Sequence, residues 1–251
     1  MSTHASAGRT WTPEELQALT VEGSFRLRGL EVTRLDTFVD AAFAFVLTLL
    51  VISFDELPES YAEMLDAIKR IPAFAVSFAM LMVFWLEHRS FSRRYGLENP
   101  RTLALSLMLI FTVLVYVFPL RTIAAGMFAQ MSGGLLPAGF SVRTYEELRG
   151  LFLFYSVGFL AMSLILFALL QEVLRAGDAL GLDARERTVT TADRDTWVVC
   201  MGVGATSVAI ALVATEEGIV LAGWVYWLLA VLIPLVYHRC RRRLAALEEA
   251  A

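Results

Sequence analysis

The stretch RLDTFVDAAFAFVLTLLVISF, residues 34–54, indicates the class of fold. No charged residue follows Asp40 until Asp55, and the residues between them are almost all apolar. A helix of about 20 apolar residues spans the ~30 Å hydrocarbon core of a bilayer. The stretch therefore predicts a membrane-spanning helix that carries Arg34, Asp36 and Asp40 on its first two turns.

Five further apolar blocks follow along the chain. The 251 residues are 57% hydrophobic and 18% charged, whereas about a quarter of the residues in a soluble domain are charged. The six blocks lie at residues 35–54, 71–91, 102–124, 150–172, 196–214 and 219–237. We therefore expect an all-α, polytopic membrane protein with six transmembrane helices per subunit.

The positions of the basic residues predict the topology. With six spans, the N-terminus, the second and fourth loops and the C-terminus share one side, which holds 16 of the 21 Lys and Arg residues. Because cytoplasmic loops are enriched in Lys and Arg, both termini are predicted to be cytoplasmic. We expect a cytoplasmic N-terminal arm at 1–33, a transmembrane domain at 34–238 and a cytoplasmic C-terminal tail at 239–251, in a multi-pass protein of the cell membrane.

Two short helices are predicted outside the six blocks. Thr12 has the features of an N-cap, with Pro13 at the first helical position and Glu15 three residues after the cap. The acidic segment at 55–70 favours a short amphipathic helix before the second block.

Asp40 allows two interpretations. A charge inside a membrane helix costs several kcal/mol unless it is paired, hydrated or near the interface. Asp40 is either hydrated at headgroup depth, or it faces the bundle and accepts hydrogen bonds from neighbouring helices or from water beside a pore. Trp85 and His88 end the second block at the same expected depth. A polar network of Arg34, Asp40, Trp85 and His88 would fix the first helix against the second.

Several function classes are disfavoured by composition. With three His and two Cys, the chain has no evident metal or cofactor site and no hydrolase or phosphate-binding motif, so no enzyme is expected. The scarcity of acids deep in the apolar blocks argues against a proton-coupled transporter. The arginine clusters are short and flank the spans, which gives no basis for nucleic-acid binding. The basic stretch at 238–243 is compatible with contact to anionic lipid.

Two motifs carry a resemblance to a known family. RLDTFVDAAFAFVLTLLV at 34–51 and SFAMLMVFWLEHRSF at 77–91 resemble prokaryotic members of the transmembrane protein 175 family. These are potassium channels whose first helix carries an Arg-x-x-x-Phe-Ser-Asp signature. The matching residues are Arg34, Phe38, Asp40, Phe43, Ala44, Thr48, Leu49, Leu50, Trp85 and His88.

The resemblance implies a homotetramer whose first helices surround a central pore for K⁺ ions. Apolar side chains would then form the constriction, and the Thr-Val-Gly-Tyr-Gly sequence that a carbonyl filter needs does not occur here. The family's pore-lining face maps onto Phe38, Ala41, Phe45, Thr48 and Ile52. Steps of three and four residues keep such positions on one side of a helix.

Two positions depart from the family pattern. Val39 replaces the serine of the signature, which removes a hydroxyl that can bond an adjacent helix. Phe45 occupies the constriction position, where an aliphatic residue is usual, so four copies would form a narrower and stiffer plug. We expect a potassium-permeable cation channel with no cofactor, in contact with the lipid bilayer and with other copies of itself. The alternatives are a secondary transporter of a small solute and a non-conducting membrane scaffold.

Overall fold

The computed structural model describes residues 5–6, 10–23, 25–52, 59–138, 142–216 and 218–249. This part of the chain is mostly helical, and five of its helices are long and apolar enough to cross a membrane. They are α3 (Tyr61–Tyr95), α4 (Pro100–Met131), α5 (Tyr145–Arg175), α6 (Ala184–Val213) and the continuous helix Leu221–Glu249. The last of these comprises α7 (Leu221–Trp224), the 3-10 turn η1 (Val225–Leu228) and α8 (Leu229–Glu249).

The remaining elements precede the long helices or connect them. They are α1 (Pro13–Gln17), α2 (Arg34–Ile52), and the two-residue strands β1 (Ala5–Ser6), β2 (Val21–Glu22), β3 (Phe25–Arg26) and β4 (Leu97–Glu98). Strand β1 pairs parallel with β4, and β2 pairs antiparallel with β3 as a small hairpin.

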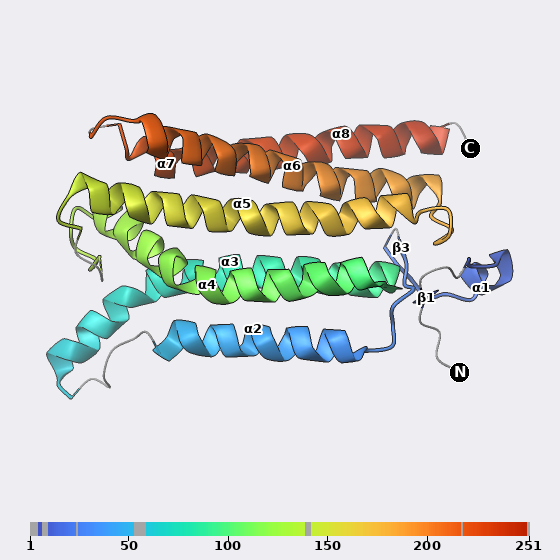
Figure 1. Cartoon of the computed structure of the whole chain (residues 1–251), viewed down its shortest axis with the longest axis horizontal. Coiled ribbons are helices and arrows are strands. Elements are labelled where there is room, and N and C mark those ends of the chain that lie inside the picture. Colours follow the sequence, from blue (N-terminus) through green and yellow to red (C-terminus); the bar gives the residue numbers. More distant parts are fainter. Residues whose placement is uncertain are drawn as a thin grey trace.

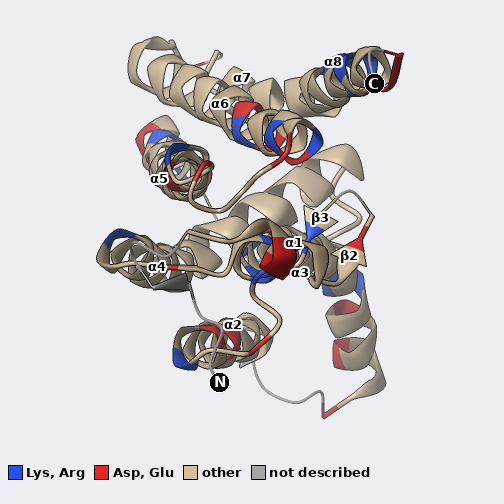
Figure 2. Cartoon of the chain, turned by 90° about the vertical axis from the view of Figure 1, so that its right-hand side faces the viewer, with Lys and Arg blue, Asp and Glu red and all other residues tan. Residues whose placement is uncertain are grey.

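The long helices lie side by side as a bundle, with both ends of the chain at the same end of the molecule (Figure 1). Helix α5 packs between α4 and α6, while α2 contacts mainly α3 and α4. Helices α2 and α8 lie at opposite edges of the bundle in both Figure 1 and Figure 2. Figure 2 also shows acidic and basic residues gathered at the end where the termini lie.

The predicted apolar blocks at 71–91, 102–124 and 150–172 fall within helices that extend beyond them. The other three blocks overlap α2, α6 and the helix Leu221–Glu249 but differ from them at one end: α6 ends at Val213, the last helix begins at Leu221, and residues 53–54 of the first block lie outside the described residues. Helix α3 begins at Tyr61, after the N-cap Ser60. The amphipathic helix expected at 55–70 is therefore not separate: residues 61–70 form the first part of α3, and residues 55–58 lie outside the described residues. Helix α6 begins at Ala184, where Asp183 and Glu186 form a capping box. Hydropathy marks only the apolar part of a helix, whereas caps in the polar region determine where its backbone bonding begins.

Three of the helices contain a proline in their interior. Pro72, Pro119 and Pro234 lie inside α3, α4 and α8. Proline has no backbone N–H and its ring clashes with the preceding turn, which bends a helix at that point. Helices α3 and α4 bend visibly toward the end of the bundle opposite the termini (Figure 1).

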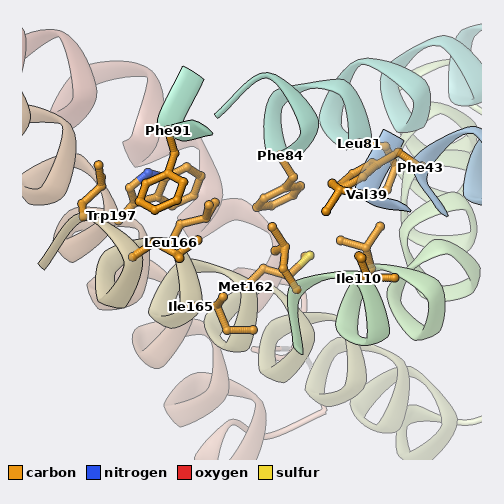
Figure 3. Close-up of a cluster of buried hydrophobic side chains, with 14 of the residues drawn as sticks. Val39, Phe43, Leu81, Phe84, Phe91, Ile110, Met162, Ile165, Leu166 and Trp197 are labelled. Carbon is orange, nitrogen blue, oxygen red and sulfur yellow. The ribbon is translucent and has the colours of Figure 1, made fainter. Parts of the chain in front are cut away.

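Apolar side chains from five helices form the core. Figure 3 shows Val39 and Phe43 of α2 beside Leu81 of α3, with Ile110 of α4 nearby. Farther along the core, Phe84 stacks on Trp197, with ring centroids 5.8 Å apart. This packing attaches α2 to the rest of the bundle by one side only, because its main contacts are α3 and α4.

The N-terminal segment packs on the bundle rather than extending from it. The predicted capping box of Thr12 and Glu15 is confirmed at the start of α1. Trp11, Phe25 and Leu27 are buried, and the Trp11 backbone N–H donates to the Ala179 carbonyl at 3.1 Å. The chain therefore reaches α2 from a fixed position.

Candidate functional site

Helix α2 has two distinct faces within a single chain. One face is buried against α3 and α4, and its side chains are at most 3% exposed: Val39, Phe43, Val46 and Leu50. The other face carries Phe38 and Phe45, which are 54% and 56% exposed, together with the exposed residues Ala41 and Thr48. The backbone of Ile52 ends the helix, and its side chain lies outside the described residues.

The exposed face of α2 combines large apolar groups with one hydroxyl. Thr48 Oγ1 donates to the Ala44 carbonyl of its own helix at 3.0 Å, which leaves its oxygen lone pairs on the exposed side. Val51 extends the face toward the end of the helix and is also exposed. A contiguous apolar surface of this kind marks contact with lipid or with another protein chain.

A single side-chain hydrogen bond joins the exposed part of α2 to α3. Trp85 Nε1 donates to Asp40 Oδ1 at 2.7 Å, while the Asp40 side chain remains exposed. The Arg89 guanidinium lies over the Trp85 ring, 5.2 Å from its centroid. Because Asp40 is two residues after Phe38 and five before Phe45, this bond acts together with the buried face of α2 to set the orientation of the helix that presents both rings.

Asp36 makes the second polar connection between α2 and α3. Ser92 Oγ donates to Asp36 Oδ1 at 2.5 Å. The Asp36 Oδ2 atom accepts from the Thr33 backbone N–H at 3.0 Å, and Thr33 Oγ1 accepts from the Asp36 N–H at the same distance. Neither Thr33 nor Ser92 was predicted from the sequence as a site residue, although the Thr-x-x-Asp spacing is the signal of a capping box.

The other two residues of the predicted polar network have different surroundings. His88 is buried, and its Nε2 lies 2.9 Å from Ser106 Oγ of α4. Arg34 is exposed and makes no ion pair with the described residues. The four residues therefore do not form one continuous network in the chain; Asp40 and Trp85 are brought together, and His88 connects α3 to α4.

A buried ion pair lies behind the start of α2. Arg28 Nη2 lies 2.8 Å from Glu186 Oε2, and the two side chains are 0% and 1% exposed. Arg28 Nε also donates to the Leu180 carbonyl at 2.8 Å, and the Arg26 N–H donates to Glu186 Oε1 at 2.8 Å. The pair therefore joins the N-terminal segment to the first turn of α6, and the bond to Leu180 joins it to the turn before α6.

The segment between this ion pair and α2 crosses α3 at close range. The Gly29 N–H donates to the Arg93 carbonyl at 3.1 Å. A Cβ at Gly29 would lie 2.2 Å from the Ser92 carbonyl oxygen, and Gly96 opposite has φ +54°. Glycine at both positions allows the two backbones to touch, which holds the chain just before α2 begins.

Comparison with known proteins relates this arrangement to one family. Residues 34–119 match the sequence model of the endosomal/lysosomal potassium channel TMEM175. A protein of Marivirga tractuosa named "Potassium channel" is 30% identical over 169 residues, which cover 65% of this chain and 68% of that protein. The chain belongs to the TMEM175 family. The family consists of ion channels, not enzymes.

Two crystal structures support the TMEM175 fold. One contains a variant of the potassium channel MtTMEM175 in complex with a nanobody–MBP fusion protein, with a TM-score of 0.75 and 27% identity over 89% of this chain and 99% of that chain. The other is a lysosomal potassium-selective channel TMEM175 homolog from Chamaesiphon minutus. It has a TM-score of 0.52 and 19% identity over 82% of this chain and 96% of that chain, and it shows the fold alone.

The TMEM175 match covers α2, α3 and the part of α4 up to Pro119. The hydrogen bonds of Asp36 to Ser92, of Asp40 to Trp85 and of His88 to Ser106 lie inside it. Arg28 and Glu186 lie outside it, and no local sequence signal joins two residues that are 158 positions apart. Both cysteines are free and buried, and no group of three or more His, Cys, Asp or Glu among the described residues is placed to hold a metal ion.

Proposed function

We propose that this TMEM175 chain forms a homotetrameric potassium-permeable channel in the cell membrane, with the exposed face of α2 toward the shared axis. The observation that carries the proposal is the two-sidedness of α2. Its buried face attaches it to its own subunit, while Phe38, Ala41, Phe45 and Thr48 remain available. Membership in a family of potassium channels supports the choice of ion.

In this proposal α2 crosses the membrane in addition to the five long helices and is the first of six spans in chain order, and both termini are cytoplasmic. Its 19 residues are about 28 Å long at 1.5 Å per residue, close to the ~30 Å of the hydrocarbon core. Asp36 and Asp40 then lie near the headgroups at the cytoplasmic end, where a carboxylate is hydrated. The excess of Lys and Arg on the side of the termini supports this orientation.

Phe45 is the proposed constriction, with Phe38, Thr48 and Ile52 as further pore-facing positions. A ring of four phenyl groups excludes water from a narrow passage, so an apolar constriction controls conduction by dewetting. Discrimination between cations would then depend on pore width and on the free energy of removing water from each ion. The Asp40–Trp85 hydrogen bond supports the orientation of α2 that this function needs.

Two measurements on the purified protein test the proposal. The mass of the detergent-solubilised assembly should equal four chains, because a pore on the symmetry axis needs an assembly. Reconstituted liposomes should pass K⁺ down its gradient without a counter-substrate, and Phe45→Ala should raise the flux or alter the cation preference. Phe154→Ala is the matched control, because Phe154 is 52% exposed on α5, away from α2, and the flux should not change.

The rival functions give different results. A secondary transporter would move K⁺ only when coupled to a second solute. A non-conducting scaffold would leave both the wild type and Phe45→Ala silent. A monomeric assembly, or equal effects of Phe45→Ala and Phe154→Ala, contradicts the assignment of α2 as the pore helix.

A further inference from the structure

Helix α8 forms the outer edge of the bundle. It packs mainly on α6, at the edge opposite α2 (Figures 1 and 2). Cys240 is its buried residue, whereas Val231 and Leu235 are 60% and 49% exposed and His238 is exposed. If α2 surrounds the axis of an assembly, α8 is the element farthest from that axis and therefore faces lipid.

The arginines of α8 differ from those elsewhere at this end of the molecule. Most of the others are paired with carboxylates: Arg26, Arg28, Arg93, Arg94, Arg101, Arg175, Arg185, Arg187 and Arg194. Arg239, Arg241, Arg242 and Arg243 are exposed, and none of them has an ion-pair or hydrogen-bond partner among the described residues. Four exposed positive charges within about one and a half turns make a local cationic surface that attracts an anionic partner from outside the chain.

A shallow, open groove on the surface of α8 ends at one of these arginines, Arg241. It has a volume of about 600 Å³ and is lined by Val231, Pro234, Leu235, Tyr237, His238 and Arg241. Most of these residues recur at steps of three or four and so share one face of the helix. Arg242 is four residues beyond His238 on that same face, while Arg239 and Arg243 lie at its flank. The groove therefore has an apolar part and a cationic end.

The groove crosses the depth at which the bundle changes from apolar to polar. Tyr237 Oη donates to Asp193 Oδ1 at 3.0 Å, and Asp193 Oδ2 accepts from Arg94 Nη1 at 3.1 Å. These charged residues mark the polar boundary on α3 and α6. Arg241 lies one turn, or about 6 Å, beyond Tyr237 toward the termini. Leu235 lies on the apolar side of the same boundary.

We propose that this groove binds an anionic phospholipid of the leaflet on the side of the termini. The lipid phosphate lies between Arg241 and Arg242, and an acyl chain lies along Leu235 and Val231. The exposed apolar wall selects a lipid rather than a free anion, and the charge selects an anionic headgroup rather than a zwitterionic one. The proposal requires the membrane orientation described above but does not depend on ion conduction.

Lipid retention by the purified full chain tests this site. The probes are phosphatidylglycerol and phosphatidylcholine with identical acyl chains, and native mass spectrometry counts the bound lipids. Wild type should retain phosphatidylglycerol preferentially. In the proposed site Arg241 and Arg242 contact the lipid phosphate directly through charge-assisted hydrogen bonds, which glutamine cannot replace. The double variant R241Q/R242Q should therefore weaken phosphatidylglycerol binding at least tenfold.

The matched control removes two charges from the flank of the same helix. R239Q/R243Q has the same net charge as R241Q/R242Q, so both variants lose the same diffuse attraction to an anionic lipid. Because Arg239 and Arg243 lie at the flank of the groove, R239Q/R243Q should reduce binding only slightly if the groove holds the lipid. Equal losses in the two variants indicate diffuse attraction and overturn the groove as a site, as does equal retention of the two lipids. Displacement by glycerol phosphate at the same concentration as the lipid assigns the arginines to a free anion and also overturns it.

The experiment measures the assembly state, lipid retention and K⁺ flux of each variant separately. Both variants should elute as the same assembly as wild type, since all four arginines are exposed and unpaired in the described chain. Silent liposomes with intact lipid retention would count against the proposed channel alone. Normal K⁺ flux without selective retention would count against the lipid site alone.

Discussion

The Arg28–Glu186 and Asp40–Trp85 pairs both attach the region around α2 to the bundle, but their surroundings differ. The first pair is enclosed, with side chains 0% and 1% exposed, and it accepts and donates several further hydrogen bonds. The second is a single hydrogen bond of 2.7 Å to a carboxylate that remains exposed.

This difference in exposure predicts different roles for the two pairs, one in the stability of the fold and the other in the orientation of α2. When one partner of a buried ion pair is removed, the other charge stays in a medium of low polarity, which is costly. When one partner of an exposed hydrogen bond is removed, water replaces it at little cost. The Arg28 pair is therefore expected to stabilise the fold, whereas the Trp85 bond is expected to fix the rotation of α2 without contributing much to stability.

The largest effect is expected from removing the charge of Glu186. Glu186→Gln keeps the shape of the side chain and its contact with the Arg26 N–H, but it leaves the Arg28 charge buried and unmatched. The free energy of unfolding should fall by ~3–5 kcal/mol. Thermal unfolding of the detergent-solubilised protein, followed by loss of the intact assembly, measures this change.

Two controls identify the cause of that loss. Arg28→Met combined with Glu186→Gln removes both charges and should recover most of the stability. Arg175→Ala removes an arginine that is 61% exposed, and Arg101 still lies 3.5 Å from the Glu172 carboxylate, so this change should cost less than ~1 kcal/mol. If Glu186→Gln is as mild as Arg175→Ala, the enclosed pair does not hold the N-terminal segment on the bundle.

The next effect compares two phenylalanines on opposite faces of α2. Phe43 is 3% exposed and packs in the core, whereas Phe45 is 56% exposed. Phe43→Ala should lower the free energy of unfolding by ~3–5 kcal/mol, because it leaves a cavity. Phe45→Ala should change the stability of the single chain by ~0.5 kcal/mol or less.

Ion flux should show the reverse order for these two variants. K⁺ flux per folded assembly should respond strongly to Phe45→Ala and weakly to Phe43→Ala. Thermal unfolding and liposome flux on the same preparations provide both readouts. A large stability loss from Phe45→Ala combined with unchanged flux would mean that this face packs against protein instead of lining a pore.

Most of the helical plan could be predicted from hydropathy, because each apolar block had to become a helix to satisfy its backbone in a bilayer. The boundaries could not be predicted in the same way. Helix α3 begins at Tyr61 and α6 at Ala184, both well inside polar sequence. In those turns the caps of Ser60 and Asp183 determine where the helix begins, and apolar composition carries no signal of them.

The candidate site was predictable mainly through the family resemblance, which implied Phe38, Ala41, Phe45 and Thr48 as pore-facing residues. Steps of three and four residues keep these positions on one side of a helix, and the structure exposes that side. The Arg28–Glu186 pair depends on how the first 30 residues fold back onto the turn before α6. A contact of that kind is decided by tertiary packing, which a single sequence does not reveal.

The last variant, Trp85→Phe, is expected to have a small effect on stability and a measurable effect on ion preference. This change keeps an aromatic ring in place but removes the Nε1 donor to Asp40, so the exposed carboxylate is hydrated instead. The free energy of unfolding should change by ~1 kcal/mol or less, while α2 loses the bond that fixes its rotation and the preference for K⁺ over Na⁺ falls. Reversal potentials in planar bilayers measure that preference.

Trp227→Phe is the control, because Trp227 is 53% exposed and its indole makes no hydrogen bond with the described residues, so neither readout should change. If Trp85→Phe were as destabilising as Glu186→Gln and left the ion preference intact, the exposed bond would be a structural contact and the distinction between the two pairs would fail.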